Sequence, residues 1–197
     1  LIKNFFITIK TKGFIAGFFA IKNFFIILLV NFFSSSAFIR KKIFNYKMYL
    51  DPRDKGISRT LLLFGERELD HKIILEKVLK KDMRVFDIGA NIGYYVLMES
   101  AILGMNGKII AVEPVPKNIQ LLKRNLELNK NNITTTLQVG LSNLIEKKDF
   151  LLSEHSNLGH ILDDDNYKNK KKNKNSNNKF KQINKKNIFT RFYPYGY

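Results

Sequence analysis

The sequence predicts an α/β fold with a parallel sheet, because short strand-like patterns alternate with longer helix-like patterns between residues 48 and 165. Two further observations support this prediction. A glycine-containing loop follows the first predicted strand of the alternating region, and an acidic residue follows the second. Glycine loops and acids at strand ends are typical of cofactor sites in such sheets.

The alternation begins with a helix and the first strand. Apolar spacing predicts a helix over 73–79, a strand over 84–88 and a second helix over 92–103. Gly104 stands where a residue in the left-handed region would end that helix.

The pattern then repeats. Residues 108–112 form the second predicted strand, and residues 116–128 place Ile119, Leu122 and Leu126 on one helical stripe. Residues 134–139 are rich in threonine and predict the third strand. The resulting order is strand, helix, strand, helix, strand.

The net charge of +17 is distributed unevenly. Residues 1–47 contain eight basic and no acidic residues, and residues 166–197 contain ten basic and no acidic residues. The middle, residues 48–165, holds all seventeen acids and is almost neutral. We therefore expect three parts: a basic, phenylalanine-rich extension, a globular domain, and a Lys/Asn tail of low complexity that is disordered.

The extension contains an apolar run over residues 13–33, interrupted mainly by Lys22, Asn23 and Asn31. As a helix, this run would reach roughly 30 Å, the thickness of a bilayer core. A charge near the centre of a span costs about 2.5–3.5 kcal/mol, which argues against a transmembrane helix. A membrane anchor or interfacial helix and a buried or poorly ordered extension both remain open.

The loop after the first strand separates two classes of cofactor. Gly89 and Gly93 allow a sharp turn and a close approach of backbone to ligand. Dinucleotide sites usually contain a further glycine between two such positions, and it is missing here. Asp87 precedes the loop and would favour a cationic amino group, as in S-adenosylmethionine. Glu113, after the second strand, would accept hydrogen bonds from ribose hydroxyls.

Four segments together resemble the FkbM-type methyltransferases that use S-adenosylmethionine. They are Val-Phe-Asp-Ile-Gly-Ala-Asn-Ile-Gly-Tyr-Tyr at 85–95, Gly-Lys-Ile-Ile-Ala-Val-Glu-Pro at 107–114, the helix with Leu121, Leu122, Asn125 and Asn129, and Val-Gly-Leu-Ser at 139–142. The resemblance implies a Rossmann-like class I methyltransferase fold. It also implies methyl transfer to an oxygen, commonly a hydroxyl of a sugar or natural product.

The resemblance assigns the cofactor to particular positions. The ribose would contact Glu113, and the adenine would lie beside Gly140 and Ser142. The methionine part would lie against the loop. The loop positions are Asp87, Gly89, Ala90, Asn91 and Gly93.

The resemblance weakens after the third strand. The family places a Lys-Ile-Asp-x-Glu-Gly motif at the end of a fourth strand, and this chain lacks such a segment. We therefore expect a domain truncated after the third strand, with the first strand of the sheet left as an exposed apolar edge. The catalytic base is not identified, because the acids and histidines after the third strand are better explained as loop surface. These residues are Glu154, His155, His160, Asp163, Asp164 and Asp165.

The leading hypothesis is a methyltransferase with S-adenosylmethionine as cofactor and a small-molecule or glycan acceptor. Its domain would be cytoplasmic, with membrane association through residues 13–33. No nucleic acid is expected as partner, and no metal, because cysteine is absent and the three histidines are scattered. The alternative is a non-catalytic basic protein that binds anionic membrane or nucleic acid through its charged ends. A nicotinamide or flavin oxidoreductase ranks third.

Overall fold

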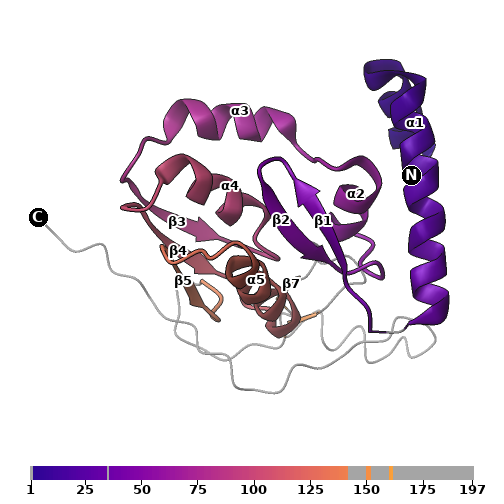
Figure 1. Ribbon diagram of the computed structural model, residues 1–197. Coiled ribbons are helices and arrows are strands. Elements are labelled where there is room, and N and C mark those ends of the chain that lie inside the picture. The colour runs from indigo at the N-terminus through magenta and orange to yellow at the C-terminus, as the bar shows by residue number, and fades with distance from the viewer. Residues whose placement is uncertain (1, 35, 142–149, 152–159, 162–197) are drawn as a thin grey trace, which may run out of the picture.

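The computed structural model describes residues 2–34, 36–141, 150–151 and 160–161. The predicted tail, residues 166–197, lies outside these residues. Figure 1 shows a small sheet with helices packed beside it, an antiparallel hairpin next to the sheet, and a long N-terminal helix along one side of the molecule.

The sheet has three parallel strands in the order β3-β4-β5. Strand β3 is Arg84–Ile88, β4 is Lys108–Val112 and β5 is Thr134–Leu137. The first two agree with the predicted bounds, and the third ends two residues early. Ile88 pairs with Val112 and Val112 with Leu137, so all three strands end at the same edge. We call this the carboxyl edge.

Helices α4 (Tyr94–Leu103) and α5 (Pro116–Leu128) connect these strands. Both crossovers proceed in the same direction across the sheet, so the right-handed rule places both helices on one face. Helix α5 has the predicted bounds. Helix α4 begins two residues later than predicted, because Gly93 has a φ of 90° and belongs to the preceding turn. Gly104 ends α4 with a φ of 73°, in agreement with its predicted role.

The antiparallel hairpin of β1 (Ile39–Ile43) and β2 (Tyr46–Leu50) was not predicted from the sequence. Strand β2 packs against α5, where the buried side-chain amide of Asn125 bonds to the backbone of Tyr49 in both directions. The hairpin spans the boundary expected after residue 47. It therefore joins the end of the extension to the domain.

Two short helices precede the sheet. Helix α2 (Ile57–Phe64) buries Leu61, Leu62 and Leu63 in the core and was also not predicted. Helix α3 (Leu69–Val78) begins four residues before the predicted 73–79 helix, ends one residue before it, and has no fully buried residue. In the described part of the chain, β3 is an edge strand and its Phe86 side chain is 56% exposed, as expected for the first strand of a three-stranded sheet.

Helix α1 covers Ile2–Phe33 and is interrupted at Gly13, which has a φ of 83° and a ψ of 172°. The part from Gly13 to Phe33 is long and apolar enough to cross a membrane. It packs against α2, which lies beside it in Figure 1. Two short strands, β6 (Phe150–Leu151) and β7 (His160–Ile161), form a separate antiparallel pair.

Candidate functional site

The predicted cofactor residues meet at the carboxyl edge. Asp87 lies near the end of β3, and Glu113 directly follows β4. The backbone N–H groups of Gly89 and Ala90 both donate to the carbonyl oxygen of Val112, at 2.8 and 3.0 Å. The loop is therefore pinned to the end of the neighbouring strand before it enters α4.

The two loop glycines have different surroundings. Both have positive φ, 86° at Gly89 and 90° at Gly93, which favours glycine. A Cβ atom on Gly93 would lie 2.6 Å from Cδ1 of Leu122, so this glycine lets α4 begin close to α5. A Cβ atom on Gly89 would meet no heavy atom of the described residues within 4 Å. The open space at the loop therefore lies beside Gly89.

Glu113 links the loop after β3 to the segment after β4 through hydrogen bonds to its side chain. Its side chain is only 4% exposed, and its Oε2 accepts a hydrogen bond from the Asn91 backbone N–H at 2.9 Å. Its Oε1 accepts from the Val115 N–H at 3.0 Å and from the Asn118 side-chain amide at 3.2 Å. Burial raises the pKa of Glu113, and these three hydrogen bonds oppose the rise. Sequence reasoning assigned Glu113 to ribose and missed its role in joining the two loops.

Asp87 and Glu99 add two further carboxylates that face the same region. The Oδ2 of Asp87 and the Oε2 of Glu99 are buried and have no hydrogen-bond partner among the described residues. Burial raises the pKa of Asp87 to about 6, and the neighbouring Glu113 adds to this rise. Burial also raises the pKa of Glu99 to about 7, with a contribution from Asp87. We call Asp87, Glu99 and Glu113 the carboxylate cluster.

Glu99 was not among the predicted site residues. It lies in the middle of α4, where a helix that is apolar on both sides gives no sequence signal for a binding residue. A single acid within that apolar helix was the available clue.

The structure describes some of the remaining predicted site residues and not others. Ala90 and Asn91 are buried in the loop, and the Oδ1 of Asn91 accepts from the Ile92 N–H at 2.9 Å. Gly140 follows β5 by three residues and is half-buried. Ser142 lies outside the described residues, as do the side chains of the acids and histidines considered as bases after the third strand.

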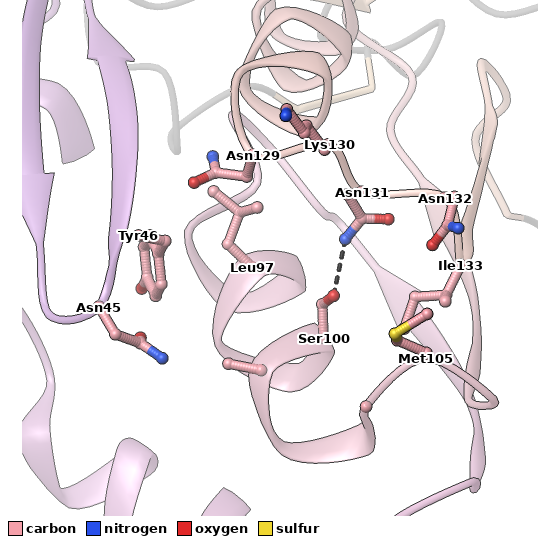
Figure 2. A pocket seen from close by; sticks show the side chains of 12 residues that line it. Asn45, Tyr46, Leu97, Ser100, Met105, Asn129, Lys130, Asn131, Asn132 and Ile133 are labelled. Atoms are coloured by element: carbon pink, nitrogen blue, oxygen red, sulfur yellow. Dashed lines mark hydrogen bonds between the residues drawn. The ribbon is translucent and has the colours of Figure 1, made fainter.

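A pocket of about 280 Å³ lies away from the carboxyl edge, at the C-terminal end of α4 (Figure 2). Its walls come from that helix end, the β1–β2 turn and the segment before β5. The Asn131 amide donates to the Ser100 hydroxyl at 2.7 Å across one side. None of the predicted cofactor residues lines this pocket.

The described residues contain no group of three acids or histidines able to hold a metal ion.

Comparison with known proteins identifies the domain. A family model described as the methyltransferase FkbM domain matches residues 87–190, just over half of the chain. The chain belongs to the FkbM methyltransferase family. This membership confirms the predicted family, its class of enzymes that use S-adenosylmethionine, and the Rossmann-like fold class. It does not favour the alternative of a non-catalytic basic protein.

One curated relative is similar to a short stretch of this FkbM domain. Protein-L-isoaspartate O-methyltransferase 1 of Arabidopsis thaliana is 37% identical over 54 residues, which are 27% of this chain and 24% of the relative. The chain therefore spans about a quarter of the length of that curated relative.

Solved structures overlap with a larger part of the chain. P. horikoshii TYW2 in complex with MeSAdo is 21% identical with a TM-score of 0.42, over 54% of this chain and 38% of that one. M. jannaschii tRNA m1G37 methyltransferase is 23% identical with a TM-score of 0.39, over 57% and 35% of the two chains. Overlaps of this extent support no separate conclusion about the FkbM domain.

Proposed function

We propose that the carboxyl edge binds S-adenosylmethionine, and that the whole enzyme transfers the methyl group to a hydroxyl oxygen of a sugar or another natural product. One observation carries the cofactor proposal, within the described residues: Asp87 has a buried oxygen without a hydrogen-bond partner, and two residues later the backbone of Gly89 borders open space. An unpaired buried carboxylate is costly in the free protein, and a cationic ligand group would offset that cost.

The charge of the cluster supports this cofactor over a dinucleotide. Besides burial, the Glu113 carboxylate raises the pKa of Asp87, and the Asp87 carboxylate raises the pKa of Glu99. A pyrophosphate would add negative charge to the same region. The methionine part of the proposed cofactor has an ammonium group, a sulfonium and a single carboxylate. Its net charge is therefore positive, and its two cationic groups are favoured by nearby carboxylates.

The proposed binding roles follow from the contacts. Asp87 would accept a hydrogen bond from the cofactor ammonium group, and Gly89 would let the ligand approach the backbone. Glu113 already holds three donors, and a carboxylate has about four acceptor positions, so it retains capacity for one ribose hydroxyl. The bound cofactor would supply an electrophilic methyl group. The acceptor hydroxyl is inferred from the family resemblance, and its base is not assigned.

Calorimetric titration with S-adenosylhomocysteine tests the cofactor site. We expect Asp87→Asn to weaken binding roughly tenfold or more, since the lost charge–charge hydrogen bond is worth about 1.5–3 kcal/mol. Asp70→Asn, at an exposed acid on α3, is the matched control and should leave binding unchanged. If the unaltered chain does not bind S-adenosylhomocysteine, or binds NAD equally well, the proposed cofactor site is wrong.

A further inference from the structure

The part of helix α1 from Gly13 onward carries its two asparagines on the face toward the domain, beside small and apolar residues, and leaves most of its large apolar side chains exposed. Between Gly13 and Phe33, the face that packs on the domain carries both asparagines, Asn23 and Asn31, together with Ala20 and the 1% exposed Ile27. The outer face is almost entirely apolar. Its large exposed side chains are Phe14, Ile15, Phe18, Phe19, Ile21, Phe25, Ile26, Leu28, Leu29, Phe32 and Phe33.

The inward asparagines make specific contacts with the domain. The Asn23 amide donates to the carbonyl oxygen of Leu63 at 3.1 Å. Leu63 is in the last turn of α2, where carbonyl groups have no partner within the helix. The Asn31 amide donates to the carbonyl oxygen of Pro52 at 3.3 Å. These two hydrogen bonds hold the C-terminal half of α1 on the domain and define which side of it faces inward.

This arrangement matches an apolar surrounding medium. In water, a surface helix turns its apolar stripe toward the core, whereas in lipid the polar side chains turn toward protein. Patches of exposed apolar surface this long mark interaction sites. Exposed basic residues flank the apolar run in the sequence, with Lys10 before it and Arg40, in β1, after it, and such residues favour anionic lipid headgroups.

The docking also determines how the helix meets the membrane. If Gly13 to Phe33 crossed the bilayer, the docked α2 and the charged loop at residues 53–55 would be drawn into hydrocarbon. Irregular backbone and charged loops do not occur in contact with lipid at that depth. Lys22 is exposed on the outer face itself. In a span it would lie near the bilayer centre, whereas from a helix at the surface its long side chain has only a short distance to bend back to the headgroups.

We propose that α1 lies in the plane of a lipid bilayer surface, with its outer apolar face in the acyl chains and the methyltransferase domain docked on its inner face. The partner is the bilayer itself. The proposal does not depend on the identity of the cofactor or the acceptor.

Flotation of the full chain with vesicles made of equal parts phosphatidylcholine and phosphatidylglycerol provides the first test. We expect the unaltered chain to float, and Phe18→Ser with Phe25→Ser to lower its partition constant roughly 150-fold or more, because each phenylalanine buried in the acyl chains contributes about 1.5–3 kcal/mol. The matched control, Ile73→Ser with Ile74→Ser, removes two exposed apolar side chains from α3 and should change partition little. Failure of the unaltered chain to float would overturn the proposal.

Depth measurements separate a flat helix from a span. The chain has no cysteine, so single-cysteine variants at Phe14, Phe25 and Phe32 can each be labelled with a fluorophore. These three positions share the outer face, by helical spacing. Quenching by spin-labelled lipids should place all three at similar shallow depth. A label at Phe25 that lies much deeper than the other two would show a span and overturn the in-plane arrangement.

Discussion

The carboxylate cluster and the outer face of α1 both depart from the usual placement of side chains, in opposite ways. The cluster buries charged groups, whereas the outer face of α1 exposes apolar groups. In the carboxylate cluster, Glu99 and Glu113 are buried and Asp87 is half-buried, and one buried oxygen each of Asp87 and Glu99 has no hydrogen-bond partner among the described residues. On α1, eleven large apolar side chains face outward. Each region has the environment that its chemistry disfavours in an isolated domain in water.

The difference shows what each region requires from a partner. The carboxylate cluster is small, buried and geometrically defined, so a single ligand with positive charge would satisfy it. The outer face of α1 is long and nearly uniform, so any sufficiently large apolar phase would satisfy it. Substitutions in the cluster should therefore have effects on stability and ligand binding that depend on pH and on single atoms. Substitutions on the outer face of α1 should have effects on membrane binding that depend on the apolar area removed.

The largest expected effect is the loss of Glu113. We expect Glu113→Ala to lower the free energy of unfolding by about 2–5 kcal/mol, because two buried backbone N–H groups, at Asn91 and Val115, would lose their acceptor. Urea denaturation followed by circular dichroism measures the change. Glu127→Ala, at an exposed acid on α5, is the control. Equal stability of both variants would show that Glu113 does not hold the two loops together.

The two glycines of the loop should respond differently to the same substitution. Gly93→Ala places a methyl group against Leu122 and forces a positive φ on alanine, with an expected cost of about 2–4 kcal/mol. Gly89→Ala imposes only the backbone strain, about 1–2 kcal/mol. Gly89→Ala should nevertheless lower the affinity of the folded protein for S-adenosylhomocysteine, because the added methyl group would occupy the space where the ligand approaches the backbone. If binding by folded Gly89→Ala protein is unchanged, the ligand does not approach this glycine.

The sequence predicted the sheet and its two connecting helices because their signals are local. Lys108–Val112 is a compact apolar run, and Pro116–Leu128 has a clear helical stripe and a proline at its start. The hairpin β1–β2 was missed because its pairing depends on distant contacts. Asn125, 76 positions further along the chain, bonds to the backbone of Tyr49. No window around Tyr49 contains that information.

The site was predictable where it follows strand ends. Asp87 and Glu113 were found because parallel strands that end in acids bring those acids to one edge. The function of Glu113 in holding the loops, and the approach of Glu99 to Asp87, depend on side-chain directions set by packing. The separate roles of Gly89 and Gly93 likewise depend on Leu122, which is distant in sequence.

The pH dependence of stability tests the carboxylate cluster directly. The pKa values of Asp87 and Glu99 are raised to about 6 and about 7, above those of the unfolded chain. The folded state therefore binds more protons between about pH 4 and pH 7, and its stability falls as the pH rises through this range.

We expect Glu99→Gln to remove part of this fall and to raise the free energy of unfolding at pH 8 by about 1–2 kcal/mol. Urea midpoints at pH 5 and pH 8 give the comparison. Asp70→Asn, on the exposed side of α3, should leave the pH dependence as it is. A Glu99→Gln variant with the original pH dependence would show that Glu99 carries no burial penalty.

The smallest effect is expected on α1 and depends on the medium. In water, Ile27→Val trims a buried side chain and should cost about 1 kcal/mol, whereas Phe25→Val, on the 59% exposed Phe25, should change stability by less than about 0.5 kcal/mol. For binding to vesicles, Phe25→Val should have the larger effect of the two variants, because only Phe25 would contact lipid. Urea denaturation and vesicle flotation of the same two variants measure both orders. If Phe25→Val were the more destabilising change in water, the outer face of α1 would be packed against protein.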